Sequence, residues 1–431
     1  MRSGAFKIHL RARIEDTLRY RRAPRVALAL GWWSLARTIP IQDRRWLDHA
    51  CAAARSATSA SLMIAIEKWI QSRLERVPVE VLWSWMPGEA AEARVSKSAI
   101  LKPSGDGEKG VLFISFESQW EHLTSLGPQR LARLAEEYEL VLAPTWSPPH
   151  MLVNYVFPRL FGGTLHCTIS NLRDLEILPR LSRSYRPVRL FASSWVNPGL
   201  YHPKPHSERD IDLVMVANFG RYKRHHAVFS AMSGISEEKR PHITLVGQPH
   251  GDRTAEVLLR EMESYGVRNS FTLRSRITDA ELVDILCRSR AALITSLREG
   301  SCVAVVEAMM ADTPLALLRG AEIGSAAFLN EHTGRWLDEG KLAEDLLDFI
   351  AQSSRYSPRR WLLDNHVECH SSSRILNDHL RDHLQTRGQS WTQDTFPHHW
   401  RPDPVYLNPD HKAAATAAAA RLKDQFGLVL G

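Results

Sequence analysis

The sequence predicts an α/β protein built from two doubly wound domains, and three observations support this. The chain has 431 residues, which exceeds the usual size of a single domain. Short apolar runs typical of buried strands recur along it, and segments with a helical pattern separate them. Strands that alternate with helices are typical of parallel sheets. The hydrophobic content of 44% and the charged content of 24% are ordinary for a folded globular chain.

The first half of the chain begins with helical sequence and then alternates. An Ala-rich region from about 46 to 76 has a helical pattern that Pro78 ends. The runs 79–85 and 111–116 are predicted as strands separated by a Gly/Pro/Ser loop over 102–109. The next predicted elements are helix 127–138, strand 140–143, helix 148–160, strand 164–169, helix 172–181 and strand 188–192.

The second half resumes the alternation after the polar, turn-rich segment 197–205, which suits an interdomain linker. Thr278 and Glu281 are spaced as the cap of one of its helices. The predicted elements are strand 212–216, helix 225–232, strand 243–246, helix 253–265, strand 271–273, helix 279–287, strand 291–294, helix from 303, strand 315–318 and a helix from about 324.

The two ends of the chain differ from these halves. Residues 1–25 hold eight basic and two acidic side chains, and Phe6, Leu10, Ile14 and Leu18 recur every four residues. This pattern fits a basic amphipathic helix on an anionic membrane surface, and equally a solvated helix that packs one stripe on the N-terminal domain. At the other end, a His- and Arg-rich helix is predicted over 361–384, and the Ala-rich run 413–420 favours a further helix.

The stretch 298–314 is the most informative part of the sequence. Glu299 falls in the loop after a predicted strand, and Glu307 falls in the largely apolar helix that follows. Such loops bind ligands in open α/β sheets, and the N–H groups that open the helix attract phosphate. Two carboxylates would repel phosphate but accept hydrogen bonds from sugar hydroxyls. The implied ligand is a nucleotide sugar, although paired Glu residues also arise by chance at exposed helix starts.

Glu299 and Glu307, with seven residues between them and followed by Ala308-Met309 and Thr313-Pro314, resemble the E-x(7)-E signature of retaining group 1, family 4-like glycosyltransferases. The resemblance extends from about 212 to 338. It implies the GT-B fold, with two Rossmann-like domains facing a cleft. It also implies that Glu299 contacts the donor sugar, as a catalytic residue, and that Glu307 binds the ribose. The residues implied to bind the donor between these two are Gly300, Ser301, Cys302 and Val303.

A second motif is the basic loop after strand 212–216. In the family, an Arg and a Lys spaced five apart neutralise the donor phosphates. Lys223 aligns with the Lys and is the second predicted catalytic residue, whereas Asn218 occupies the Arg position. Arg221 or Arg224 could supply the missing charge. The basic turn could equally be a solvated one, since Lys and Arg are common on loops.

Other candidates carry weaker signals. Gly247 resembles a glycine near the donor base, although turns need glycine anyway. Cys302 stands where many relatives carry glycine, and a catalytic thiol is disfavoured because no base lies on its loop. Five residues near predicted strand ends of the first domain could line an acceptor cleft, but each fits a surface or packing role better. They are Glu117, Trp120, His122, His150 and Asn171.

The expected domains are a basic helical extension over 1–76, an N-terminal Rossmann-like acceptor domain over 77–200, a C-terminal Rossmann-like donor domain over 201–355, and a crossing helix with a Trp/His/Pro-rich tail over 356–431. Neither a membrane-spanning segment nor a signal peptide is expected. Five scattered cysteines indicate no metal site or disulfide framework. The expected location is cytoplasmic, peripheral at the inner membrane face through residues 1–25.

The favoured function is a metal-independent retaining glycosyltransferase that needs no cofactor. Its substrates would be a nucleotide-diphosphate sugar and a glycan or lipid-linked acceptor, as in polysaccharide or lipopolysaccharide biosynthesis. The alternative is a catalytically silent GT-B-like protein that binds nucleotide sugar or glycan. A nicotinamide dehydrogenase is disfavoured because no G-x-G-x-x-G follows either first strand. Nucleic acid is not an expected partner, since only the formal charge of +7 would favour it.

Overall fold

The computed structural model describes residues 3–105, 107–400 and 403–431. The chain forms two compact units: unit 1 comprises Met1–Tyr20 and Val196–Glu368, and unit 2 comprises Arg21–Trp195 and Cys369–Gly431. Each unit is built on one mainly parallel sheet. The doubly wound α/β alternation predicted for both halves is therefore confirmed, whereas the four domain boundaries stay predictions.

Unit 1 holds a six-stranded sheet in the order β12-β11-β10-β7-β8-β9, and all neighbouring strands are parallel. The strands are β7 (Ile211–Val216), β8 (Ile243–Gly247), β9 (Phe271–Ser275), β10 (Ser289–Ile294), β11 (Leu315–Leu318) and β12 (Gly334–Leu337). The helices are α1 (Ser3–Tyr20), α10 (His225–Ser233), α11 (Ala255–Tyr265), α12 (Asp279–Cys287), α13 (Val303–Met310), α14 (Leu342–Ala351) and α15 (Pro358–Asp364). The chain crosses between the middle strands β7 and β10, where the winding direction reverses.

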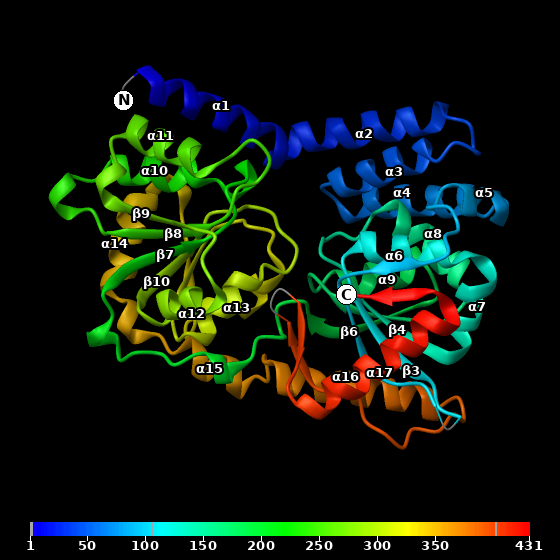
Figure 1. The fold of residues 1–431 in the computed structure, drawn as a ribbon. Coiled ribbons are helices and arrows are strands. Elements are labelled where there is room, and N and C mark those ends of the chain that lie inside the picture. Colours follow the sequence, from blue (N-terminus) through cyan, green and yellow to red (C-terminus); the bar gives the residue numbers. More distant parts are fainter. Residues whose placement is uncertain (1–2, 106, 401–402) are drawn as a thin grey trace. The chain divides into compact units, whose positions relative to one another are not determined.

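The core of unit 1 lies between its sheet and α10, α11 and α14 (Figure 1). Alternate residues of the strands, such as Leu213 and Met215 of β7, point to this face and pack on Phe229 and Met262. Thr278 and Glu281 form the predicted capping box at the start of α12.

Unit 2 holds a five-stranded sheet in the order β2-β3-β4-β5-β6, which is parallel except that β2 pairs antiparallel with β3. The strands of this sheet are β2 (Ser98–Lys102), β3 (Gly110–Ser115), β4 (Tyr138–Ala143), β5 (Leu165–Ile169) and β6 (Tyr185–Phe191). The helices that alternate with them are α6 (Glu117–Leu123), α7 (Gly127–Glu137), α8 (Leu152–Phe161) and α9 (Asp174–Leu181).

The rest of unit 2 comes from both sides of this alternation. Before it lie α2 (Arg22–Thr38), α3 (Arg45–Ser56), α4 (Ala60–Leu74), α5 (Val79–Ser84) and β1 (Ala93–Val95). After the return of the chain come α16 (Cys369–Gln385), β13 (His398–Trp400), β14 (Pro404–Tyr406), α17 (Pro409–Phe426) and β15 (Leu428–Leu430). Leu376, Leu380 and Leu384 of α16 pack on the sheet residues Phe113 and Val141, so this helix covers one sheet face.

The helical pattern predicted for 46–76 is confirmed as α3 and α4, and Ser59 caps the second of these helices by accepting from the Leu62 N–H. Three local predictions are wrong. The run 79–85 is helix α5, because Pro78 presets a helical entry and its carbonyl accepts from the N–H of Val81 and Leu82. The region 361–384 is two helices, interrupted where His366 has a φ of 59°. The helix expected from Gly324 is a short 3-10 turn, Gly324–Phe328.

Helix α1 packs within unit 1, not on the N-terminal sheet domain that the sequence suggested. Ile8 packs against the unit 1 core, and Asp16 accepts hydrogen bonds from Arg224. A different stripe faces outward: Leu10, Ile14 and Leu18 are 48%, 53% and 54% exposed. The side chain of Phe6, the first member of the predicted stripe, lies outside the described residues.

Candidate functional site

The candidate site lies where β7 and β10 run side by side in the middle of the unit 1 sheet. The loop after β7 carries Lys223, and the loop after β10 carries Glu299. Both loops leave the carboxyl ends of parallel strands at the point where the strand order reverses. Open α/β sheets bind ligands at this point, because the loops diverge there and leave room.

Lys223 and Glu299 contact each other directly. The Lys223 Nζ donates to Glu299 Oε2 at 2.6 Å, and both side chains are largely buried. Burial lowers the pKa of Lys223, but its neighbours, among them the Glu299 carboxylate that it contacts, raise it by more, so its pKa lies above the ordinary value and the ammonium is charged. The structure therefore brings together the two residues that the sequence predicted as catalytic.

The other carboxylate oxygen of Glu299 is not satisfied. Glu299 Oε1 is buried and makes no hydrogen bond with any residue that the structure describes. A buried charged acceptor without a partner costs about 1–3 kcal/mol or more, unless something else donates to it. A ligand hydroxyl at this position would supply the missing donor.

The Glu299 loop is held rigidly by a neighbouring segment. The N–H of Glu299 donates to the Glu322 carbonyl at 3.0 Å, and the N–H groups of Gly324 and Ser325 donate to the carbonyls of Gly300 and Ser301 at 2.7 and 3.0 Å. The Ser325 hydroxyl also donates to the Ser301 carbonyl. Gly300 and Ser301 thus position the loop through their backbones.

Cys302 begins helix α13 in a left-handed conformation, with φ 58° and ψ 79°, and gives the helix no side-chain cap. Glycine is favoured in this conformation, which explains why a glycine suits the position. Burial, followed by the neighbouring Glu299 carboxylate, raises the pKa of the Cys302 thiol, so it is protonated at neutral pH and poorly nucleophilic. The first N–H groups of α13, from Val303 onward, emerge directly beside this pair of loops.

Two further buried polar groups lie close to Glu299 in the chain. Glu307 is buried in the second turn of α13, as its position in the sequence predicted. The other group is Ser296, which no sequence motif predicted; it follows β10, is only 1% exposed and has a hydroxyl with no hydrogen-bond partner among the described residues. A polar residue directly after a buried strand is the signal that could have identified it.

The other predicted donor-binding residues have different local roles. Asn218 accepts from the Gly220 N–H and donates to the Tyr222 hydroxyl, so it shapes the β7 loop. Arg221 lies 3.7 Å from the exposed Asp252 and lines a cavity of about 140 Å³ beside α1. Gly247 closes β8 where a Cβ would meet the Ala217 carbonyl at 2.0 Å, so close strand packing alone requires a glycine.

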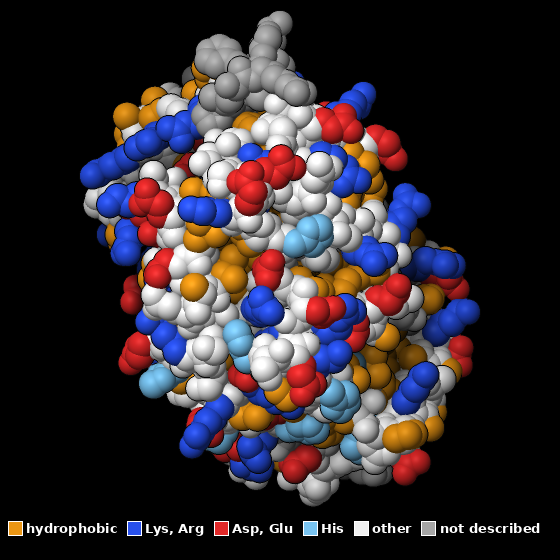
Figure 2. Space-filling view, turned by 90° about the vertical axis from the view of Figure 1, so that its left-hand side faces the viewer, with side chains coloured by type: hydrophobic (Ala, Val, Ile, Leu, Met, Phe, Trp, Pro, Cys, Tyr) orange, Lys and Arg blue, Asp and Glu red, His pale blue; other side chains and the backbone are white. Residues whose placement is uncertain are grey.

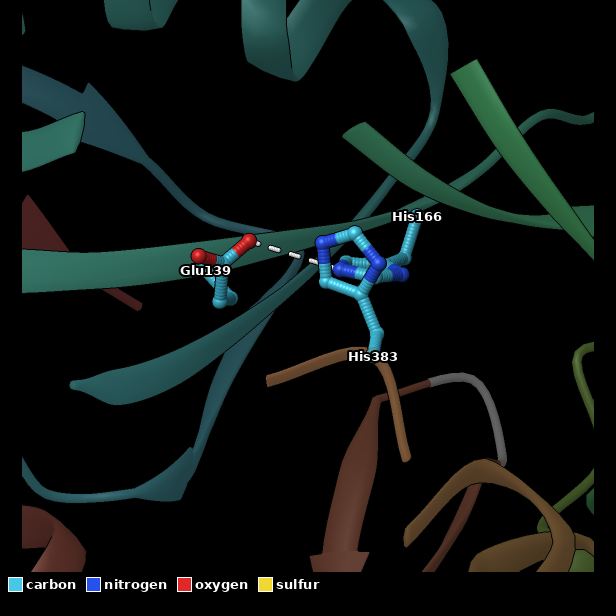
Figure 3. Close-up of side chains that lie close together, drawn as sticks. All are labelled: Glu139, His166 and His383. Atoms are coloured by element: carbon cyan, nitrogen blue, oxygen red, sulfur yellow. Dashed lines mark ion pairs between the residues drawn. The ribbon is translucent and has the colours of Figure 1, made fainter. Parts of the chain in front are cut away.

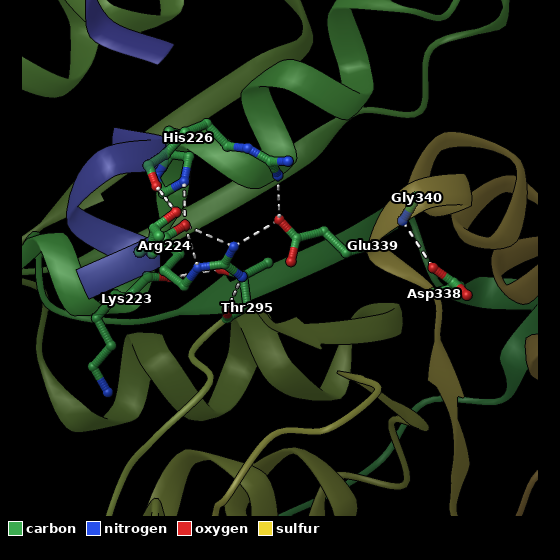
Figure 4. Close-up of polar contacts among 10 residues, drawn as sticks. Lys223, Arg224, His226, Thr295, Asp338, Glu339 and Gly340 are labelled. Atoms are coloured by element: carbon green, nitrogen blue, oxygen red, sulfur yellow. Dashed lines mark hydrogen bonds and ion pairs between the residues drawn. The ribbon is translucent and has the colours of Figure 1, made fainter. Parts of the chain in front are cut away.

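Arg224 is fully engaged away from the Lys223 side chain (Figure 4). Its guanidinium donates to Asp16 on α1 at 2.8 and 3.0 Å, to Glu339 at 2.7 Å and to the Thr295 carbonyl at 3.2 Å. The side chain is 1% exposed, so it holds α1 and the β10 end together. Arg224 is therefore not the replacement for the missing phosphate-binding Arg.

In unit 2, three of the five candidate acceptor residues, Glu117, Trp120 and His150, are buried in structural roles, whereas His122 is exposed and Asn171 is half-buried. The carboxylate of Glu117 accepts from the N–H and hydroxyl of Thr145, and the Trp120 indole donates to Asn154. His150 is fully buried, 3.3 Å from Glu67. Asp174, which no sequence motif predicted, accepts from Ser147 and from the N–H groups of Ser170 and Asn171, and burial raises its pKa to about 6.

The match to a known protein family lies within unit 1. Residues 201–360 match the family model described as glycosyl transferases group 1, which is well under half of the chain. No curated protein matches the sequence. The part of unit 1 that carries Lys223, Glu299 and Glu307 is thus similar to group 1 glycosyl transferases.

Among solved structures, sucrose-phosphate synthase from Thermosynechococcus elongatus is similar with a TM-score of 0.50 and 16% identity, over 64% of this chain and 74% of that chain. TarM has a TM-score of 0.48 and 11% identity, over 63% of this chain and 54% of that chain. The pneumococcal O-GlcNAc transferase GtfA, in complex with UDP and GlcNAc, has a TM-score of 0.43 and 14% identity, over 58% and 53%. The match thus spans about half the length of TarM and of GtfA.

The first of these likenesses concerns the fold alone, and it agrees with the GT-B class: two Rossmann-like domains with helical extensions. Among the described helices, none is both long and apolar enough to cross a lipid bilayer. On the face of the molecule in Figure 2, Lys and Arg side chains alternate with Asp and Glu side chains. The net charge of +7 is therefore not gathered into one basic surface on that face.

Proposed function

We propose that this protein is a retaining glycosyltransferase that moves a sugar from a nucleotide-diphosphate donor to a glycan or lipid-linked acceptor. The observation that carries the proposal is the buried Lys223–Glu299 pair at the strand-order reversal of unit 1, with Glu299 Oε1 left without a partner. A cation for phosphate and an acceptor for a sugar hydroxyl lie side by side there. The match of residues 201–360 to group 1 glycosyl transferases supports it.

The chemistry assigns separate tasks to the two residues. Cleavage between the anomeric carbon and the diphosphate places negative charge on the leaving group, which Lys223 and the first N–H groups of α13 stabilise. When the diphosphate binds Lys223, Glu299 is released to accept from sugar hydroxyls through both oxygens. Glu307 would accept from the ribose hydroxyls. The configuration at the anomeric carbon would be retained because the acceptor attacks the face of the sugar from which the phosphate leaves. This phosphate would take the acceptor proton, and no divalent metal is assigned a role.

A catalytically silent nucleotide-sugar or glycan-binding protein is the second candidate. Asn218 replaces the expected Arg and is bonded within its own loop, and Arg224 is bonded to Asp16 and Glu339. The diphosphate would then meet fewer cations than in a typical active member of the family. Such a protein would bind the donor without transferring or hydrolysing the sugar.

Donor binding is expected to raise the unfolding temperature of the wild type when UDP-, GDP- and ADP-sugars are screened in a thermal-shift assay. Glu299→Ala should lose the extra stabilisation that the sugar gives over the matching nucleoside diphosphate. Glu307→Ala should weaken binding of the nucleotide sugar and of the nucleoside diphosphate alike by about 10–150-fold, because a hydrogen bond to a charged group contributes about 1.5–3 kcal/mol. A transfer assay on the best donor then separates the enzyme from the silent protein.

The exposed residue Glu237 supplies the matched control, because Glu237→Ala removes the same group from the unit 1 surface. This variant should bind every donor as the wild type does. If no donor stabilises the wild type, or if Glu307→Ala binds as tightly as the wild type, the proposed site is wrong.

We also propose that α1 attaches the protein to an anionic membrane surface, where a lipid-linked acceptor would lie. Leu10, Ile14 and Leu18 form an exposed apolar stripe, and Arg11 and Arg13 lie beside it on the same helix. The free energy of such binding combines the burial of apolar side chains in the headgroup region with the attraction of arginines to anionic lipids.

This attachment predicts that the protein co-sediments with phosphatidylserine-containing vesicles and that binding falls as salt rises. Changing Leu10, Ile14 and Leu18 together to Ser should weaken binding at least about tenfold, because each apolar side chain contributes up to about 1.5–3 kcal/mol on burial. Leu363→Ser, which alters another exposed leucine of unit 1, is the control and should have no effect. Equal binding of the triple variant and the wild type would contradict the attachment.

A further inference from the structure

Unit 2 contains a cluster of histidines and a glutamate that the proposed transfer reaction does not use. Glu139 is near the start of β4 and His166 near the start of β5, and both point to the sheet face that α16 covers. His379 and His383 are four residues apart on α16, so they lie on one side of this helix. Figure 3 shows the imidazole of His383 reaching from α16 to the Glu139–His166 pair.

The ligand atoms of Glu139, His166 and His383 all lie within 4.8 Å of one another. His166 Nε2 is paired with Glu139 Oε2 at 3.3 Å, whereas His383 Nε2 is buried without a hydrogen-bond partner among the described residues. A buried ring nitrogen beside a histidine–carboxylate pair is therefore left unsatisfied, which is costly unless another group lies between them.

His379 determines what His166 can do. His166 Nδ1 lies 2.9 Å from His379 Nε2, so one ring donates to the other. If His166 donates from Nδ1, its Nε2 presents a lone pair toward Glu139 Oε2, and two lone pairs at 3.3 Å repel each other unless a cation joins them. An imidazole that donates from one nitrogen and ligates through the other is the usual state of a metal-binding histidine.

We propose that Glu139 Oε2, His166 Nε2 and His383 Nε2 bind a divalent transition metal, best matched by Zn²⁺, and that His379 is a positioning residue for His166. Zn–N and Zn–O bonds of about 2.0–2.2 Å in a tetrahedral site place ligand atoms about 3.4 Å apart. The 3.3 Å between His166 and Glu139 already matches this separation. Two imidazoles and one carboxylate favour Zn²⁺ over Mg²⁺ or Ca²⁺, which prefer oxygen ligands.

The surrounding charges are compatible with one bound cation. Lys109 Nζ lies 3.0 Å from Glu139 Oε1 and so leaves Oε2 available. Arg186 and Arg387 lie near His383 and act against a cation, which limits the affinity of the site.

The position of the cluster indicates what the metal does. Glu139 and His166 are each the second residue of their strand, so the cluster lies at the amino ends of β4 and β5. Ligands of open α/β sheets bind at the opposite, carboxyl ends. The metal would therefore join α16 to the sheet and stabilise unit 2 without taking part in transfer, and this inference stands or falls independently of the proposed function.

The test uses full-length protein without an affinity tag, freed of metal by a chelator and titrated with ZnCl₂ in a calorimeter. We expect one saturable site per chain and an unfolding temperature that rises with Zn²⁺ concentration. His379→Ala should weaken binding about 10–100-fold, as loss of a group that orients a metal ligand does, and His383→Ala should weaken it more. His332→Ala, which removes a histidine whose side chain is 61% exposed, should change neither binding nor stability.

His383→Gln provides a variant that keeps the size of the side chain if His383→Ala does not fold. The absorption spectrum of Co²⁺ bound at the site, which reports coordination by nitrogen and oxygen, should appear in the wild type and be lost in this variant. Absence of saturable Zn²⁺ binding by the wild type, or equal affinity of the wild type and His383→Gln, would overturn the proposal.

Discussion

Replacing Lys223 by alanine is expected to lower kcat/KM for sugar transfer about 10²–10³-fold, because a preorganised charged donor to the leaving group is worth about 2.7–4 kcal/mol in the transition state. Lys223 is suited to this task because it is buried and charged, and its Nζ lies 2.6 Å from Glu299 Oε2. When the donor binds, Lys223 would exchange its contact with Glu299 for a contact with the diphosphate. The measurement is the initial rate of transfer at donor concentrations below KM, with the donor found by thermal shift.

Arg221 provides the matched comparison on the same loop. It faces the exposed Asp252 and the cavity beside α1, so Arg221→Ala should reduce kcat/KM less than about threefold, the range of a surface charge. Lys223→Arg should retain more activity than Lys223→Ala, because arginine keeps the positive charge although its guanidinium differs in shape from an ammonium group. The assignment of Lys223 as the cation for the diphosphate fails if Lys223→Ala is as active as the wild type or if Arg221→Ala has the larger effect.

Replacing Arg224 by methionine is expected to lower the free energy of unfolding of unit 1 by about 3–5 kcal/mol, the cost of removing one partner from a buried ion pair. Arg224 is 1% exposed and donates to Asp16, Glu339 and the Thr295 carbonyl, and methionine keeps its bulk but none of these bonds (Figure 4). Because Asp16 belongs to α1, the variant should also release this helix. Urea denaturation and the rate of tryptic cleavage in α1 measure the two effects.

Arg288→Met is the control for this prediction, because Arg288 pairs with Asp210 and Asp284, which are both more than half exposed. Its loss should cost less than about 1 kcal/mol. If Arg224→Met costs no more than Arg288→Met, the contacts of Arg224 do not hold α1 to the unit.

The contacts of Asp16 with Arg224 and His226 determine how the stability of unit 1 changes with pH. Burial raises the pKa of Asp16, but hydrogen bonds from His226 and Arg224 and the charge of Arg224 lower it by more, so its folded pKa lies below 3.8. The stability that Asp16 contributes is therefore complete above about pH 4 and is lost as the pH falls through the folded pKa. Arg224→Met should reduce this loss, because the arginine is one of its causes.

The candidate site could be predicted where its residues are close in sequence. Glu299, Gly300 and Glu307 follow a buried strand within one loop and helix, and local spacing alone placed them correctly. Lys223 was predicted because it resembles the phosphate-binding Lys of the family in its place after another strand, and parallel strands bring their carboxyl ends to one edge. Ser296 was missed because a single serine has no periodic signal, and only its burial without a partner distinguishes it.

The roles of the neighbouring arginines could not be predicted in this way. The sequence of this basic loop does not distinguish Arg221 from Arg224. In the structure, Arg224 has a left-handed backbone that turns its side chain toward α1, about two hundred residues earlier in the chain. The short run 79–85 also misled, because a few apolar residues fit either a strand or a helix until Pro78 and the packing of Leu82 decide.

By itself, the sequence determined the doubly wound α/β alternation of this protein and the order of polar groups at the strand ends, because both follow from local periodicity and from the geometry of parallel strands. The tertiary structure decided which side chains meet across long separations. It joined Lys223 to Glu299, Arg224 to Asp16, and Glu139 to His166 and His383. Such pairings depend on the order of the strands and on which helix covers each sheet face, and no local pattern encodes them.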